Sequence, residues 1–174
     1  MKTLVIHPND PTTSFLDVVY NETDWTIFND NKVHNQEKFT ELITSHDRII
    51  MMGHGTPDGL LGNRCYIIDD RHSSLLKDKE VVCMWCNAHA FFCHYGLKGF
   101  FTGMIISEEI EADYLGISYK DGDVDESNVL FTKALKDSIQ NTPKAMCDKM
   151  KEIYVPTEGN KVMEYNAKRL YYFE

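Results

Sequence analysis

The fold is decided by two stretches of the sequence, DRIIMMGHGTPDGLLG at Asp47–Gly62 and EVVCMWCNAHA at Glu80–Ala90. Each contains a short apolar run without polar alternation, and each run leads into a reactive side chain, His54 in the first and Cys86 in the second. Apolar runs of this length are typical of strands that are buried on both faces, as the central strands of parallel sheets are. Both stretches therefore predict buried parallel strands.

The two reactive side chains follow their strands at equivalent places. In open parallel sheets, ligands bind just beyond the carboxyl ends of the strands. If the two strands are neighbours, His54 and Cys86 lie one or two strand spacings of ~4.8 Å apart at that edge. Their positions predict a Cys/His dyad.

On either side of these two stretches, strand and helix patterns alternate along the rest of the chain. We expect strands at 2–7, 25–28, 65–68, 104–107 and 114–119. We expect helices at 14–20, 36–45, 73–79, 128–139 and 142–154, and a helix of about two turns within 89–101 that ends near Gly96 or Gly99. The segment after 160 fits either a helix or a strand. This alternation predicts a three-layer α/β/α sandwich with a mainly parallel sheet, formed by a single domain over residues 1–174. Right-handed crossovers would place the strands that begin at Lys2, Asp47 and Val81 side by side.

Length and composition are those of a globular protein. A chain of 174 residues can bury a core without help from disulfides. Its five cysteines follow no framework spacing, and its N-terminal segment lacks the apolar region of a secretory signal, so we expect a cytoplasmic protein with reduced thiols. No apolar run reaches the ~20 residues of a membrane span. The formal charge of −9 argues against nucleic acid and anionic membranes as partners.

The chemistry of a cysteine beside a histidine points to nucleophilic catalysis. The thiolate is the reactive form of cysteine, and imidazole is the side chain that best transfers protons near neutral pH. Glycines flank His54, and a backbone without side chains lets a substrate approach closely. The N–H groups of Gly55 and Cys86 are therefore candidates for an oxyanion hole.

The order "apolar block, His-Gly, apolar block, Cys" resembles the group of cysteine peptidases that includes caspases, gingipains, clostripain, legumain and separase. The segment RIIMMGHG is similar to their histidine block and EVVCMWCNA to their cysteine block. The resemblance covers about residues 1–116 and is closest to small bacterial or phage-type members. It implies the caspase–hemoglobinase fold and hydrolysis of peptides or proteins through a thioester, without a cofactor or metal. Cys86 would be the nucleophile, and His54 would assist proton transfer.

One position departs from the pattern of that group. Two residues before the cysteine, several members have a side chain that selects the substrate's P1 residue, on the acyl side of the cleaved bond; this chain has Met84, which cannot select a charge. Our candidates for binding a basic P1 side chain are Asp10, Asp58, Glu108 and Glu109. We expect a basic or small polar P1 residue.

Two other functions fit the same residues. The chain can be a catalytically inactive module that keeps the fold and binds proteins in its groove. The C-x-x-C of Cys83 and Cys86, followed by His89, Cys93 and His94, can also be a metal or thiol-redox site. Against that reading, there is no second C-x-x-C, and residues i and i+3 of a strand point to opposite faces. The sequence carries no signal for an oligomeric state.

Overall fold

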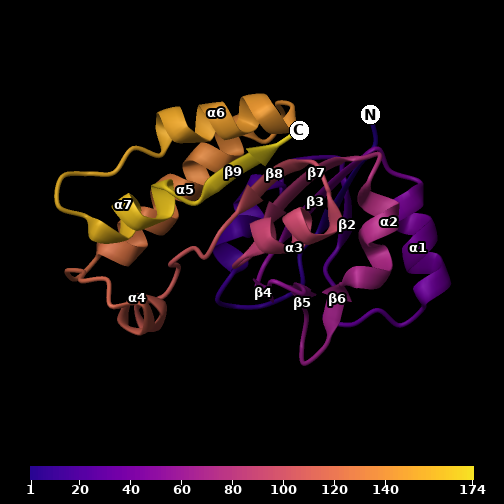
Figure 1. Ribbon diagram of the computed structural model, residues 1–174, viewed down its shortest axis with the longest axis horizontal. Helices are drawn as coiled ribbons and strands as arrows, with labels where there is room; N and C mark the ends of the chain where they lie inside the picture. The colour runs from indigo at the N-terminus through magenta and orange to yellow at the C-terminus, as the bar shows by residue number, and fades with distance from the viewer.

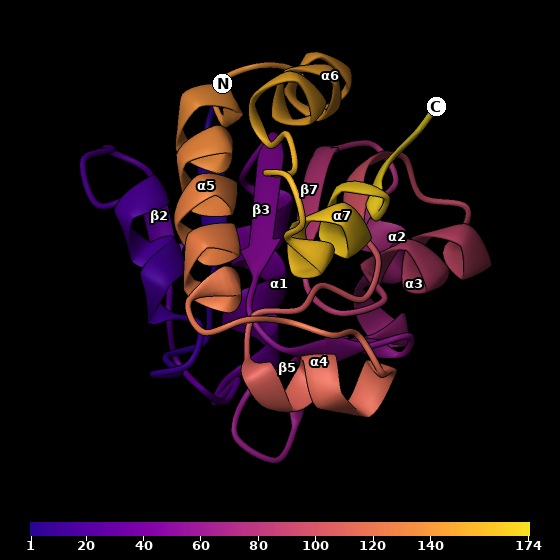
Figure 2. The same ribbon diagram turned by 90° about the vertical axis from the view of Figure 1, so that its left-hand side faces the viewer.

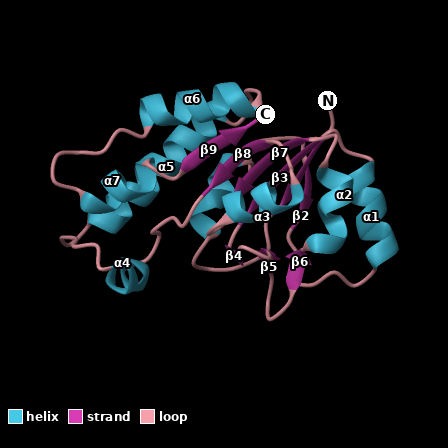
Figure 3. Ribbon diagram, viewed as in Figure 1, coloured by secondary structure: helices cyan, strands magenta, loops and turns pink.

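Six strands form the central sheet of the computed structural model, which describes residues 1–174 (Figures 1 and 3). In spatial order they are β2 (Thr26–Phe28), β1 (Thr3–Ile6), β3 (Arg48–Met52), β7 (Glu80–Met84), β8 (Gly99–Thr102) and β9 (Leu170–Phe173). The first five are parallel, and β9 runs antiparallel to β8. The mainly parallel α/β fold expected from the sequence is confirmed.

The two decisive stretches form the adjacent strands β3 and β7 at the centre of this sheet. Their register pairs Met52 with Met84, so both strands end at the same level. All five residues of β3 are buried, as are the last four of β7. Because the strands are parallel and end together, the residues that follow them meet at one edge of the sheet.

Helices cover both faces of the sheet. They are η1 (Ser14–Val19, a 3-10 helix), α1 (Gln36–Thr44), α2 (Ser73–Leu76, preceded by the short η2, Asp70–His72), α3 (Ala88–Tyr95), α5 (Asp123–Ser138), α6 (Pro143–Ile153) and α7 (Lys161–Ala167). One further helix, α4 (Glu109–Leu115), packs on α5 and α7 rather than on the sheet. Successive residues of β3 alternate between the two faces: Ile50 and Met52 pack with η1, α5 and α6, whereas Ile49 and Met51 pack with α1, α2 and α3. In Figure 2, α5 and α3 lie on opposite sides of β3. None of the helices has the length and apolar character that a bilayer crossing requires.

A small antiparallel sheet follows β3 directly. It consists of β4 (Gly55–Thr56), β5 (Gly59–Leu61) and β6 (Tyr66–Ile68), of which the sequence predicted only the last. Trp85 packs against Gly55, where a Cβ would meet the indole Cδ1 at 2.2 Å, and its Nε1–H donates to the Thr56 carbonyl at 3.1 Å. The second glycine after β3 is therefore required by the indole of the neighbouring strand end, a reason that the sequence did not reveal.

Several sequence-based boundaries are wrong. The helix expected over 14–20 is a 3-10 helix, Ser14–Val19, and Thr13 does not cap it through its side chain. No strand forms at 104–107 or 114–119; the second overlaps α4, and Ile106 packs with α5 and α7 in a small separate cluster. The helix expected from 89 ends at the left-handed Gly96, one of the two glycines predicted to end it, but the strand β8 that begins at Gly99 was not expected. The segment after 160 contains both a helix, α7, and a strand, β9.

Candidate active site

A cavity lies beyond the carboxyl ends of β3 and β7, with a volume of about 50 Å³. His54 and Cys86 both line it, together with Gly53 and Trp85 from the same strand ends. Its other walls come from η1, β8, α5, α7 and the segment that follows β8. We call it the strand-end cavity. The fold thus places the thiol and the imidazole predicted from the sequence at one shared cavity.

A tight turn positions Cys86 between β7 and α3. The next residue, Asn87, adopts the left-handed conformation with a φ of 66°, which asparagine tolerates better than most residues. The chain reverses there, with the Ala88 N–H donating to the Trp85 carbonyl at 3.2 Å, and α3 begins at once. The Cys86 N–H itself donates to no group, so it is free to bind an oxygen of a ligand.

The Cys86 thiol is protonated in the resting structure. Burial, with the negative charge of Glu111 nearby, raises its pKa to about 11, although its hydrogen bond to the Ile105 carbonyl, with sulfur and oxygen 3.6 Å apart, acts in the opposite direction. At pH 7 a group with this pKa is thiolate in only about 1 molecule in 10⁴. The resting thiol therefore needs a base before it can attack.

This protonation state predicts slow alkylation of Cys86 by iodoacetamide. The rate should rise about tenfold per pH unit between pH 7 and pH 10, because it follows the thiolate fraction below the pKa. At pH 7.5 the exposed Cys93 should react before Cys86. Peptide mapping by mass spectrometry over a pH series measures both rates. A Cys86 rate that is fastest of all cysteines and flat below pH 8 would contradict the raised pKa.

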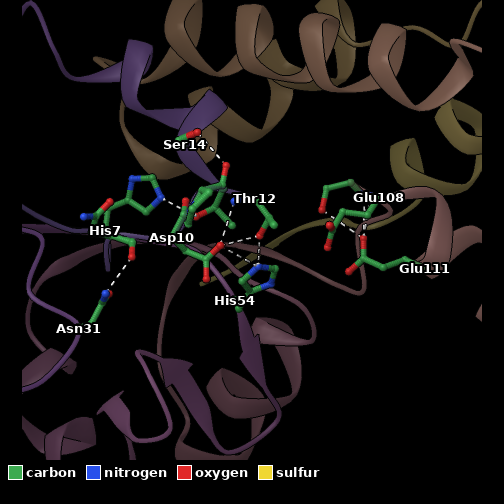
Figure 4. A network of polar contacts seen from close by, with 12 residues as sticks. His7, Asp10, Thr12, Ser14, Asn31, His54, Glu108 and Glu111 are labelled. Carbon is green, nitrogen blue, oxygen red and sulfur yellow. Dashed lines mark hydrogen bonds and ion pairs between the residues drawn. The ribbon is translucent and has the colours of Figure 1, made fainter.

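His54 is held by the loop that follows β1 (Figure 4). Its Nε2 lies 2.6 Å from the Thr12 Oγ1, and that hydroxyl donates to the Asp10 carboxylate at 2.7 Å. Because the single hydroxyl hydrogen goes to Asp10, the Thr12 oxygen accepts a hydrogen bond from Nε2–H. The neutral imidazole then carries its proton on Nε2, which leaves Nδ1 unprotonated and able to act as a base.

The loop is itself fixed at both ends. Asp10 also accepts the Thr12 N–H at 2.9 Å, and these two bonds from Thr12 lower the pKa of the Asp10 carboxyl, so it remains ionised at neutral pH. Beneath the loop, His7 contacts the Thr13 hydroxyl at 3.1 Å and the Tyr20 hydroxyl at 2.8 Å. Burial lowers the pKa of His7, which favours its neutral form.

The second proposed oxyanion donor, Gly55, stands in β4. The Leu61 N–H donates to the His54 carbonyl at 2.8 Å, so Gly55 and Leu60 face each other as a non-hydrogen-bonded pair. The Gly55 N–H therefore lies outside the β4–β5 ladder. The Cys86 and Gly55 N–H groups thus both lie outside the ladders and turns around them, but only Cys86 lines the strand-end cavity; the glycine in its wall is Gly53.

The four carboxylates proposed to bind substrate lie in different places. Asp10 is beside His54, with its Oδ1 3.8 Å from Nε2. Asp58 is exposed in the turn between β4 and β5, and Glu109 is exposed at the start of α4. Glu108 precedes α4, and its N–H donates to the Glu111 carboxylate at 3.1 Å. None of the four lines the strand-end cavity.

Residues far away in the sequence complete the cavity. Asn128 of α5 donates from Nδ2 to the Ser107 carbonyl at 2.8 Å, and both residues line the cavity. Asn166 of α7 holds both backbone groups of Ile106, with its Oδ1 accepting and its Nδ2 donating, each at 2.8 Å. Neither these asparagines nor Thr12 was predicted from the sequence to be a site residue, because no local pattern marks a polar side chain whose partner is so distant in the chain.

Cys83 and Cys86 do not share an environment. Cys83 is fully buried in the core beneath α1, α2 and α3, and burial raises its pKa well above the usual value. All five cysteines are free thiols, and no three His, Cys, Asp or Glu side chains are grouped so as to hold a metal ion.

Comparison of the chain with protein-family models, with curated proteins and with solved structures finds no match. The similarity to caspase-type peptidases therefore stays a prediction from the histidine and cysteine blocks.

Proposed function

We propose that this protein is a cysteine endopeptidase of the caspase type, with Cys86 as the nucleophile and His54 as the base. The observation that carries the proposal is the strand-end cavity, which is lined by both the thiol and the imidazole. A nucleophile and a base at the carboxyl edge of a parallel sheet, with a third group holding the base, are the parts that covalent catalysis requires.

In the proposed reaction, His54 Nδ1 takes the proton from the Cys86 thiol as the sulfur attacks the carbonyl carbon of the peptide. The N–H groups of Gly55 and Cys86 donate to the oxyanion, and His54 then returns the proton to the leaving amine as the C–N bond breaks. A thioester remains on Cys86. His54 next takes a proton from water, whose oxygen attacks the thioester, and the returning proton releases the thiol.

The loop after β1 supplies the third group. The ionised Asp10 carboxylate lies 3.8 Å from the His54 Nε2 and accepts the hydroxyl hydrogen of the Thr12 side chain that contacts this nitrogen. Thr12 fixes the ring orientation through its 2.6 Å contact with Nε2. Both are positioning residues, since they act through the imidazole.

One observation favours a second candidate function, a catalytically inactive binding module. The pKa of Cys86 is raised to about 11 by burial, whereas activated cysteines usually have a lowered pKa. In that case the half-buried thiol would be an apolar contact in the wall of a protein-binding cavity.

Labelling with a substrate-like electrophile separates the two functions. We expect peptidyl acyloxymethyl ketones, used as a mixture with Ala, Asp and Arg at P1, to modify Cys86 at pH 7.5 much faster than iodoacetamide does, because a bound peptide brings its carbonyl to the thiol while His54 takes the proton. In His54→Ala the labelling should fall at least 100-fold. Intact-mass spectrometry measures the extent of labelling over time, and peptide mapping shows that Cys86 is the labelled residue. Equal labelling of the wild type and His54→Ala would favour the binding module.

A further inference from the structure

We infer that the strand-end cavity accepts a small, uncharged P1 side chain, such as that of Ala, Ser, Thr or Val. The inference rests on the proposed function, because it assigns the substrate class of that same site. It departs from the sequence-based expectation of a basic P1 residue read by Asp10, Asp58, Glu108 or Glu109, none of which lines the cavity.

The walls of the cavity carry no charge that could pair with a charged side chain. No Asp, Glu, Lys or Arg is among its lining residues, and its only ionisable groups, His54 and Cys86, are the reacting pair. A buried charge without a partner is strongly disfavoured relative to water. A P1 Arg, Lys, Asp or Glu would therefore lose its hydration and gain nothing in return.

Most of the polar groups in the walls already form hydrogen bonds within the protein. The Ser107 hydroxyl donates to Glu111 at 3.1 Å. The Asn166 amide binds Ile106 through both of its ends. The Asn128 Nδ2 donates to the Ser107 carbonyl, which leaves its Oδ1 as an acceptor for one hydroxyl or N–H of a ligand. With so few free hydrogen-bonding groups in its walls, the cavity suits a P1 side chain with at most one polar group.

The size of the cavity limits the P1 side chain further. Its volume of about 50 Å³ is a third of the ~150 Å³ of an engineered apolar cavity that binds benzene. The apolar residues in its walls include three that are almost fully buried: Leu16 is 5 % exposed, Met84 4 % and Phe131 5 %. A side chain of one to three heavy atoms fits this space, whereas an aromatic ring does not.

The test is a set of fluorogenic peptides that differ only at P1, with Ala, Val, Phe, Arg and Asp at that position, and the full-length protein as enzyme. We expect kcat/KM for Ala and Val to exceed that for Arg and Asp at least 100-fold, and that for Phe at least tenfold. Equal or faster cleavage after Arg or Asp would overturn the inference and leave the proposed peptidase intact. Cleavage of none of the peptides, together with no labelling of Cys86 by peptidyl ketones, would overturn the proposed function and the inference with it.

A gain of specificity provides the second measurement. Asn128→Asp puts a carboxylate in the wall with almost no change in shape. The ratio of kcat/KM for P1 2,4-diaminobutyrate, a cationic residue with only three side-chain heavy atoms, to that for P1 Ala should therefore rise at least tenfold. The matched control is Gln140→Glu, which makes the same change of charge at an exposed position beyond the far end of α5 and should leave the ratio unchanged. Circular dichroism confirms that each variant is folded. An unchanged ratio in folded Asn128→Asp would count against this cavity as the P1 site.

Discussion

Cys86→Ala is expected to lose peptide hydrolysis almost completely, by at least about 10⁴-fold in kcat, because no other group at the strand-end cavity can form the thioester. His54→Ala should lose about 10²–10⁴-fold, since the thiol, with a pKa of about 11, then has no base to take its proton. Both losses are measured with a peptide carrying Ala at P1, the side chain that the cavity fits.

Two control variants change residues of α3 that do not line the cavity. Cys93 and His94 are consecutive exposed residues of α3, so Cys93→Ala and His94→Ala remove the same side-chain types without touching the cavity. Both should keep the wild-type rate. Hydrolysis by Cys86→Ala at the wild-type rate would end the peptidase proposal and leave a binding cavity of the same shape.

Gly99→Ala in the central sheet is expected to lower the free energy of unfolding by about 3 kcal/mol or more. Gly99 begins β8 with a φ of 141°, which side-chain-bearing residues rarely adopt. An added Cβ would also lie 2.1 Å from the carbonyl oxygen of Val81 in β7. Neither strand can move away, because β8 is paired with β7 on one side and β9 on the other.

Gly96→Ala is the matched control for that prediction. Gly96 ends α3 with a φ of 61°, and a Cβ there would meet nothing within 4 Å. The substitution should lower the free energy of unfolding by about 1–2 kcal/mol, which is the penalty that a side-chain-bearing residue has in the left-handed conformation. Urea denaturation followed by circular dichroism measures both variants. Equal losses for Gly96→Ala and Gly99→Ala would show that the contact with Val81 is not the cause.

The predictability of the fold differs from one element to the next. The strands β3 and β7 were predictable because an unbroken apolar run between polar segments has few other ways to be buried. The strand β8 was not, because its Phe100 and Phe101 continue the aromatic pattern of α3, and only the backbone conformations of Gly96 and Gly99 separate the two elements. The segment 104–107 is apolar enough for a strand, but Ile106 is anchored by Asn166 rather than by a neighbouring strand.

The sequence by itself determined that a thiol and an imidazole follow two buried strands, since residue type and local periodicity are sufficient for that. The tertiary structure alone decided what surrounds them: Thr12 and Asp10 on His54, the Ile105 carbonyl on Cys86, and Asn128 and Asn166 in the walls. These contacts join residues between 19 and 60 positions apart. They depend on how helices pack over the sheet edge, and no pattern of neighbouring residues encodes that packing.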